Sequence, residues 1–497
     1  MSLSRMIPSL MFAMAALPLA GQPDYLLHGA PVSPAAPDPV IAQALGAIRP
    51  AHIEQTIETL VGFGTRSTLS SMETDLPAGQ GINAAADWIA SQFNDISSRC
   101  GGCLEVKRDV FTADSTSGGH WAGRIPRPTQ ITNIYAILRG TDPAQANRMV
   151  LVTGHYDSRD TKIMDDHGAA PGANDDASGV AVSIECARAL SKLHFPATIV
   201  FAAVAGEEQG LIGSAHLAQL ARQQGWQLEA VLNNDIVGGN TTPGDTLQLK
   251  NRVRVFSEGV PETTTPEQIR RILAVGGEND SPSRELARAI AETARTYFPA
   301  TGAAAFRAAL MSRPDRYMRG GDHFSFNHEG FAAVRFTEWR EDFNHQHQDV
   351  MRPPAGSSDP VKGDLPEYVD FQYVAQVARL NAATLATLAA APGVPVSLQM
   401  PLLTSASQPG TSKTSAGELR NGTTLTWQPP AGDRVAHYQV LWRETTAPDW
   451  QYEQTVIPPA AEESVTVSLP VSKDNVIFGV RSVDAQGHAS VAVVPTP

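Results

Sequence analysis

The chain has 497 residues, of which 42% are hydrophobic and 18% charged, a composition typical of globular proteins and a length that allows more than one domain. Its formal net charge of −13 argues against non-specific nucleic-acid binding, which requires clustered lysines and arginines.

The N-terminus has the features of an export signal. Arg5 precedes the apolar stretch IPSLMFAMAALPLA, which ends at small residues and is short for a membrane span. We therefore expect residues 1–20 to be a signal peptide and the protein to be secreted or periplasmic, without a membrane span. The alternative is a disordered or buried N-terminal helix. In an exported protein, Cys100 and Cys103 are expected to form a local disulfide, and Cys186 to be a buried core residue.

The first part of the chain alternates between strand and helix patterns. Helix-like segments at 52–63 and 82–93 precede strand-like segments at 104–111 and 132–138. From residue 149 onward, apolar strands alternate with helices, and the expected ranges are 149–154, 178–193, 197–206, 210–224, 228–239 and 331–338. This order predicts an α/β fold with a mixed, centrally parallel sheet flanked by helices on both faces. Between 241 and 320 the pattern is harder to interpret: an amphipathic helix at 283–298 is clear, and 247–259 could supply strand pairing.

A second domain begins near residue 392. A stretch rich in Pro, Ser, Thr and Gly is followed by short segments with alternating hydrophobic residues, which predict an all-β sandwich. The motifs LTWQPP, HYQVLWRE and VIFGVRSVDAQGHAS resemble a fibronectin type III domain. We therefore expect an α/β domain over 21–391 and a linker with a β-sandwich over 392–497, with Trp427 and Trp442 in its core.

Acidic and imidazole side chains follow four of the expected strands. The motifs are GHYDS, GANDDASG, AGEEQG and NNDIVGG, and a later loop has the sequence EDFNHQHQD. Loops at the carboxyl ends of parallel strands converge on one crevice, where so many carboxylates would repel each other unless cations lay between them. Imidazole and carboxylate ligands in an exported protein favour zinc, and their number favours two ions. Taken singly, each motif is equally typical of a turn, a helix N-terminus or a solvated surface.

In their order and spacing, these motifs resemble those of the bacterial leucyl aminopeptidase family over residues 40–390. This family consists of co-catalytic zinc exopeptidases and includes glutamate carboxypeptidase-like members. The resemblance implies that Asp175 bridges two zinc ions, that Glu207 is the general base and that Asp157 orients His155. It implies five metal ligands, which are His155, Asp175, Glu208, Asp235 and His345.

Simple geometry supports several of these roles. Asp157 lies two residues after His155, on the same side of an extended strand, and can accept its second N–H. Glu207 and Glu208 are adjacent in an extended turn, so one can bind metal while the other faces the water. For the last ligand, His345 is preferred because Asp349 follows it by four residues, as in the family, and His347 is the alternative.

A second motif, GGDHFSF, contributes Asp322 and His323. In the family this motif lines the substrate side of the centre, and the alternative is that His323 is bound to backbone groups near a loop.

The resemblance implies an aminopeptidase that acts on peptides or proteins with a free N-terminus. A carboxypeptidase or dipeptidase of the same family would require basic residues for the substrate carboxylate, and Arg313, Arg316 and Arg319 are the candidates. A mono-zinc glutaminyl cyclase is disfavoured by the full ligand set. A non-catalytic binding protein is disfavoured because Glu207 is retained.

Overall fold

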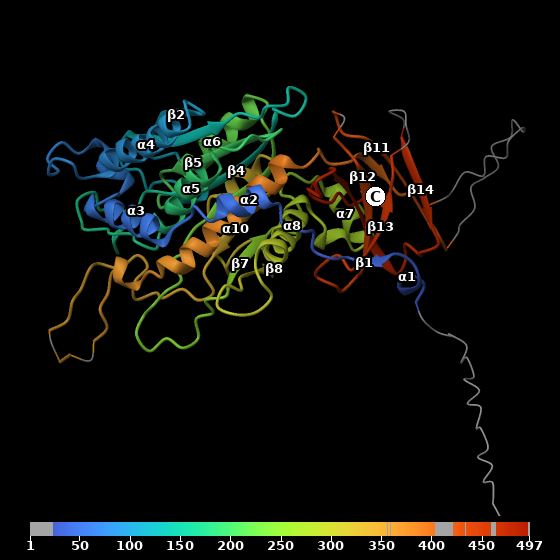
Figure 1. The fold of residues 1–497 in the computed structure, drawn as a ribbon. Helices are drawn as coiled ribbons and strands as arrows, with labels where there is room; N and C mark the ends of the chain where they lie inside the picture. The colour runs from blue at the N-terminus through green and yellow to red at the C-terminus, as the bar shows by residue number, and fades with distance from the viewer. Residues whose placement is uncertain are drawn as a thin grey trace, which may run out of the picture.

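The centre of the molecule is one large mixed β-sheet (Figure 1). The computed structural model describes residues 23–354, 356–357, 359–402, 421–432, 434–458 and 464–495, so the expected signal peptide lies outside the described residues. The eight strands have the order β2-β3-β5-β4-β6-β9-β7-β8. They are β2 (Leu104–Ala113), β3 (Thr129–Leu138), β4 (Arg148–His155), β5 (Thr198–Val204), β6 (Gln227–Asn234), β7 (Arg252–Ser257), β8 (Arg307–Met311) and β9 (Ala333–Thr337).

The middle of this sheet is parallel and its flanks include antiparallel pairs. β4 pairs in parallel with both β5 and β6, and β6 pairs in parallel with β9. β3 is antiparallel to β2 and β5, and β7 is antiparallel to β9. The predicted fold class, a mixed and centrally parallel sheet, is therefore confirmed.

Helices cover both faces of the sheet. Along β4, Val150 and Val152 belong to one hydrophobic cluster, whereas Met149 and Leu151 belong to the other, as expected for a strand buried on both sides. The larger cluster contains side chains of α2 (Pro39–Leu45), α3 (Pro50–Gly62), α4 (Ile82–Arg99), α5 (Ala177–Leu190), α8 (Pro282–Tyr297) and α10 (Phe371–Ala390). The smaller cluster contains side chains of α6 (Ile212–Gln223) and α9 (His323–His328). The remaining α-helices are α1 (Asp24–Leu27) and α7 (Pro266–Ala274).

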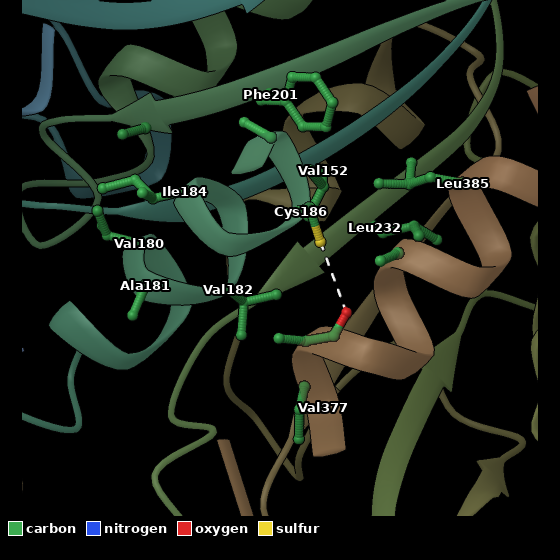
Figure 2. Close-up of a cluster of buried hydrophobic side chains, with 14 of the residues drawn as sticks. Val152, Val180, Ala181, Val182, Ile184, Cys186, Phe201, Leu232, Val377 and Leu385 are labelled. Carbon is green, nitrogen blue, oxygen red and sulfur yellow. Dashed lines mark hydrogen bonds between the residues drawn. The ribbon is translucent and has the colours of Figure 1, made fainter. Parts of the chain in front are cut away.

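The larger cluster lies between α5, the sheet and α10 (Figure 2). Cys186 on α5 is fully buried there, as predicted, and its thiol donates a hydrogen bond to the backbone oxygen of Ala378 on α10 over 3.6 Å. The expected local disulfide between Cys100 and Cys103 is present where α4 turns into β2.

The C-terminal part consists of two further antiparallel sheets that enclose a common apolar core, which confirms the predicted β-sandwich. Trp427 and Trp442 are both fully buried in this core. One sheet has the order β10-β11-β14 and the other β1-β13-β12-β15. Their strands are β1 (Ala30–Pro31), β10 (Val396–Gln399), β11 (Thr423–Gln428), β12 (His437–Glu444), β13 (Tyr452–Val456), β14 (Val465–Leu469) and β15 (Val476–Val483).

The strand β1 comes from the opposite end of the chain. Ala30 pairs with Glu453 and Pro31 with Tyr452, so the first described segment completes a C-terminal sheet (Figure 1). The nearby side chain of Asp24 accepts a hydrogen bond from the backbone of Ser472 over 2.8 Å. The sequence does not predict this contact, because two residues are too few for a strand pattern. Among the described residues, we find no helix with the length and apolar character required to cross a membrane.

Candidate metal centre

The carboxyl ends of three neighbouring parallel strands carry the predicted side chains. His155 is the last residue of β4, Glu207 and Glu208 follow β5, and Asp235 follows β6 directly. Asp175 lies in the loop between β4 and α5. Because these strands are adjacent and parallel, their ends meet at one edge of the sheet, as predicted.

One group of ligand atoms comes from His155, Glu207 and Asp235, which all lie within 4.8 Å of one another. The Nε2 atom of His155 is 3.1 Å from Asp175 Oδ1 and 3.9 Å from Asp235 Oδ1. This nitrogen is buried and has no hydrogen-bond partner among the described residues. An unpartnered buried imidazole nitrogen that faces carboxylate oxygens is a suitable metal ligand.

A second group comes from Asp175, Glu208 and His347, again within 4.8 Å of one another. His347 Nε2 is 2.9 Å from Asp175 Oδ2 and 3.1 Å from Glu208 Oε1. Asp175 therefore directs Oδ1 to His155 and Oδ2 to His347, which is the arrangement of a carboxylate that bridges two ions. Glu208 Oε1 is likewise buried without a hydrogen-bond partner in the part of the chain described. The donor set of imidazole and carboxylate groups fits zinc.

The two histidines of the last loop lie in different surroundings. His345 Nε2 lies 2.9 Å from Thr242 Oγ1 and 3.6 Å from Asp342 Oδ2, and its ring stacks on Tyr368 at 3.8 Å. His345 is therefore outside both ligand groups. The loop is an irregular turn in which His347 has a φ of +57°, so the spacing to Asp349 does not determine which ring faces the centre.

Asp157 contacts residues of both groups. The Nδ1 atom of His155 is 3.1 Å from the backbone oxygen of Asp157 and 3.4 Å from its Oδ1. The same carboxylate accepts hydrogen bonds from the backbone N–H groups of Glu207 (3.3 Å) and Glu208 (3.1 Å), and from the hydroxyl of Thr68 (3.1 Å). Asp157 thus contacts both the imidazole of His155 and the backbone of the glutamate pair.

Asp176, the second acid of the DD motif, has a structural role. Its side chain caps the N-terminus of α5 by accepting from Gly179 N–H over 2.9 Å. It also accepts from the backbone N–H groups of His155 (3.0 Å) and Ile236 (3.3 Å). The helix-cap interpretation therefore holds for Asp176, whereas its neighbour Asp175 belongs to the ligand group.

Two arginines that the sequence motifs do not include contact the candidate ligands. Arg335 on β9 is fully buried, and its Nη2 is 2.7 Å from Asp235 Oδ1. Arg159 lies 3.3 Å from Glu208 Oε2 through Nε and 2.9 Å from His347 Nδ1 through Nη2. A charged residue inside the apolar segment FAAVRFTE was a signal for Arg335, since a buried arginine requires an acidic partner.

The protonation equilibria of the centre reflect its excess of acids. Burial raises the pKa of Glu207 well above its usual value, and the negative charges of Asp235 and Glu208 raise it further. Burial disfavours the charged form of His155, but the nearby carboxylates of Asp157 and Asp175 outweigh it and raise the pKa of this histidine. The site therefore favours positive charge, which divalent ions would supply.

The other candidate residues are engaged elsewhere. His323 is fully buried, and its Nε2 is 2.9 Å from the backbone oxygen of Pro314, which matches the backbone-bound alternative. Asp322 is also buried, and its charge contributes to the raised pKa of Glu207. Arg316 and Arg319 form ion pairs with Glu341 Oε2 at 2.9 and 2.7 Å.

Comparison with known proteins identifies the family. Residues 133–359 match the model of peptidase family M28. A probable zinc metalloprotease of Pyricularia oryzae is 43% identical over 476 residues, which cover 94% of this chain and 87% of the relative. A probable zinc metalloprotease of Leptosphaeria maculans is 42% identical and covers 93% of this chain and 98% of the relative. The solved structure of the Legionella pneumophila LapA aminopeptidase is 20% identical with a TM-score of 0.47, covering 74% of this chain and 79% of that one. The chain belongs to peptidase family M28 and is a zinc-dependent metallopeptidase.

Proposed function

We propose that the protein is a di-zinc aminopeptidase that hydrolyses the N-terminal peptide bond of peptides. The observation that carries this proposal is the position of Asp175 between two ligand groups, with one carboxylate oxygen toward each histidine. His155 and Asp235 would hold one zinc ion, Glu208 and His347 the other, and Asp175 both. When bound, the ions would supply an acidified water and polarise the scissile carbonyl.

The remaining roles belong to side chains near the ligands. Glu207, whose carboxylate lies in the first group, accepts the proton of the attacking water and later delivers it to the leaving amine. Asp157 keeps the proton of His155 on Nδ1, and Arg335 holds the carboxylate of Asp235 in place through their 2.7 Å ion pair. No covalent enzyme intermediate is required.

The engaged arginines support an aminopeptidase over a carboxypeptidase. A carboxypeptidase needs a free cationic group for the substrate's terminal carboxylate, but Arg316 and Arg319 are paired with Glu341. Arg313 lies over the ring of Tyr317 at 5.7 Å. The acidic surroundings of Glu207 instead favour the positively charged amino terminus of a peptide.

The organisation of the whole chain extends the proposal. Residues 1–20 would direct secretion, residues 21–391 would form the peptidase domain, and residues 392–497 would form a linker with a fibronectin type III-like domain. The buried tryptophans of the C-terminal core and its two antiparallel sheets support the last assignment.

Glu207→Gln tests the proposed chemistry. The variant should retain two zinc ions per chain, because Glu208 and not Glu207 is a ligand, and kcat for an aminoacyl anilide should fall by roughly a hundredfold or more. Glu58→Gln, on the exposed side of α3, is the matched control and should leave both quantities unchanged. Loss of zinc in Glu207→Gln would show that the two glutamate roles are exchanged.

Chelation and substrate blocking complete the test. Removal of zinc should abolish hydrolysis, and added zinc should restore it. Dipeptides with a free N-terminus should be cleaved whether or not their C-terminus is amidated, whereas N-acetylated dipeptides should not. Activity that requires a free C-terminus would instead identify a carboxypeptidase.

A further inference from the structure

The two histidines of the centre differ in what faces their second ring nitrogen. Nδ1 of His155 is directed at two acceptors, the backbone oxygen of Asp157 at 3.1 Å and its carboxylate Oδ1 at 3.4 Å. Nδ1 therefore carries the proton, and Nε2 presents a lone pair toward Asp175 and Asp235. His155 is in the tautomer that a metal ion requires at Nε2.

His347 has the opposite arrangement. Its Nδ1 lies 2.9 Å from Nη2 of Arg159, and a guanidinium group can only donate. The ring must therefore offer a lone pair at Nδ1 and carry its proton on Nε2, where it can donate to Asp175 Oδ2 at 2.9 Å. This tautomer is the one that does not bind a metal ion through Nε2.

A ring protonated on both nitrogens would place Nδ1–H against the N–H donors of Arg159 at 2.9 Å, donor against donor. The contact geometry therefore favours a single proton on Nε2. The carboxylates near Nε2 and the guanidinium near Nδ1 therefore favour the same tautomer.

Arg159 also reaches the other ligand of this position and is held in place. Its Nε is 3.3 Å from Glu208 Oε2, and only 20% of its side chain is exposed. Two residues further on, Thr161 and Asp349 exchange hydrogen bonds of 3.2 and 3.1 Å, which join the loop of Arg159 to the loop of His347. The guanidinium thus places a positive charge beside Glu208 and His347, where it would repel a cation bound to these two side chains.

We propose that Arg159 is a positioning residue that competes with the second zinc ion for Glu208 and His347 and so makes that position bind zinc more weakly than the position at His155. This inference rests on the proposed di-zinc function. Binding of the second ion requires the proton of His347 to move from Nε2 to Nδ1 and the guanidinium to leave Nδ1. The position at His155 has no such requirement, because acceptors already face its Nδ1.

Zinc titration against a chromophoric chelator tests the proposal without an activity measurement. In the wild-type chain, two dissociation constants should be resolved. Arg159→Gln should tighten the weaker one by about tenfold or more and leave the tighter one unchanged, since a neighbouring positive charge is removed from one position only. Arg159→Lys, which keeps the charge, should stay close to the wild type.

Arg124→Gln is the matched control. Arg124 lies near the same glutamate but donates to its backbone oxygen, over 3.1 Å, and does not contact the carboxylate or His347 in the described structure. Its removal should shift the weaker constant by less than threefold. An unchanged or weakened second constant in Arg159→Gln would overturn the proposal.

A measurement on the wild-type chain keeps the proposal testable if a variant does not fold. In the metal-free protein with 15N-labelled histidine, nitrogen chemical shifts should place the proton of His347 on Nε2 and that of His155 on Nδ1. A proton on Nδ1 of His347 would contradict the role of Arg159. Failure of the wild type to bind two zinc ions would instead refute the proposed function itself.

Discussion

Asp157 connects the metal centre to the strand that precedes it. Its carboxylate belongs to neither ligand group, yet it contacts His155 and the backbone of both Glu207 and Glu208. One buried acid therefore contacts three groups of the candidate metal centre. A change at this position would alter three groups at once.

Our proposal that His347 rather than His345 is the zinc ligand leads to a direct prediction. His347→Gln should lower the zinc content from two ions to one per chain, because one donor of the second group is lost. His345→Gln should retain two ions, because His345 contacts Thr242 and Tyr368 and no ligand residue. Metal analysis after dialysis measures both. Loss of zinc in His345→Gln alone would restore the choice made from the sequence.

At the residue scale, the sequence predicts the site where the backbone is regular. The predicted residues are brought together because they lie at or beyond the carboxyl ends of β4, β5 and β6, which are neighbouring parallel strands. These residues are His155, Asp175, Glu207, Glu208 and Asp235. The histidine of the last loop could not be chosen in this way, since φ in that turn depends on tertiary contacts. Arg159 was not assigned because its partners come from segments distant in sequence.

The helix α8 links the large sheet to the C-terminal strands. Its apolar residues pack in the larger core, while its polar face contacts the sandwich. Arg288 donates to the backbone oxygen of Pro448 over 2.8 Å, and Trp450 donates to Glu285 over 3.1 Å. Arg481 of β15 forms a two-pronged ion pair with Glu292, at 2.5 and 3.0 Å. The helix therefore packs into the larger core on one side and makes polar contacts with the C-terminal part on the other.

The ion pair between Glu292 and Arg481 should contribute to stability in a pH-dependent way. Burial raises the pKa of Glu292, but Arg481 outweighs it and holds this pKa below its usual value of 4.5. Because the unfolded chain then binds the proton more tightly, the contribution is present above pH 4.5 and is lost as the pH falls through the folded pKa.

Glu292→Gln should thus lower the free energy of unfolding by roughly 2–3 kcal/mol at pH 7, and by less below pH 4.5. Urea denaturation at several pH values measures the difference. Glu267→Gln, in an exposed ion pair with Arg271, is the control and should cost under about 1 kcal/mol at every pH. A cost for Glu292→Gln that does not depend on pH would contradict the assignment.

The amphipathic pattern at 283–298 predicts α8 correctly, and the structure begins the helix one residue earlier, at Pro282. Its contact with the sandwich was not predictable, because the pattern identifies an apolar face without identifying the partner of the polar face. β10 was not predictable for a different reason: it lies in a segment whose composition is typical of a linker.

At the scale of the whole molecule, the acidic centre predicts that stability depends on zinc. Removal of the ions would leave several buried carboxylates close together, so a chelator should lower the thermal midpoint of the α/β part. Zinc at about a thousand times its dissociation constant should contribute about 4 kcal/mol to the free energy of unfolding. Calorimetry with and without chelator measures this, with magnesium as the control ion. An unchanged midpoint would show that the acids are balanced without a metal ion.

The pairing of β1 with β13 affects the order in which the molecule can be completed during synthesis. Ala30 leaves the ribosome early and Glu453 late, so this edge of the C-terminal sheet closes only after nearly all of the chain has emerged. Until β13 has emerged, β1 has no strand to pair with. Once it has emerged, β1 can cover an edge of β13 whose unpaired backbone groups would otherwise be a template for strand addition by other molecules.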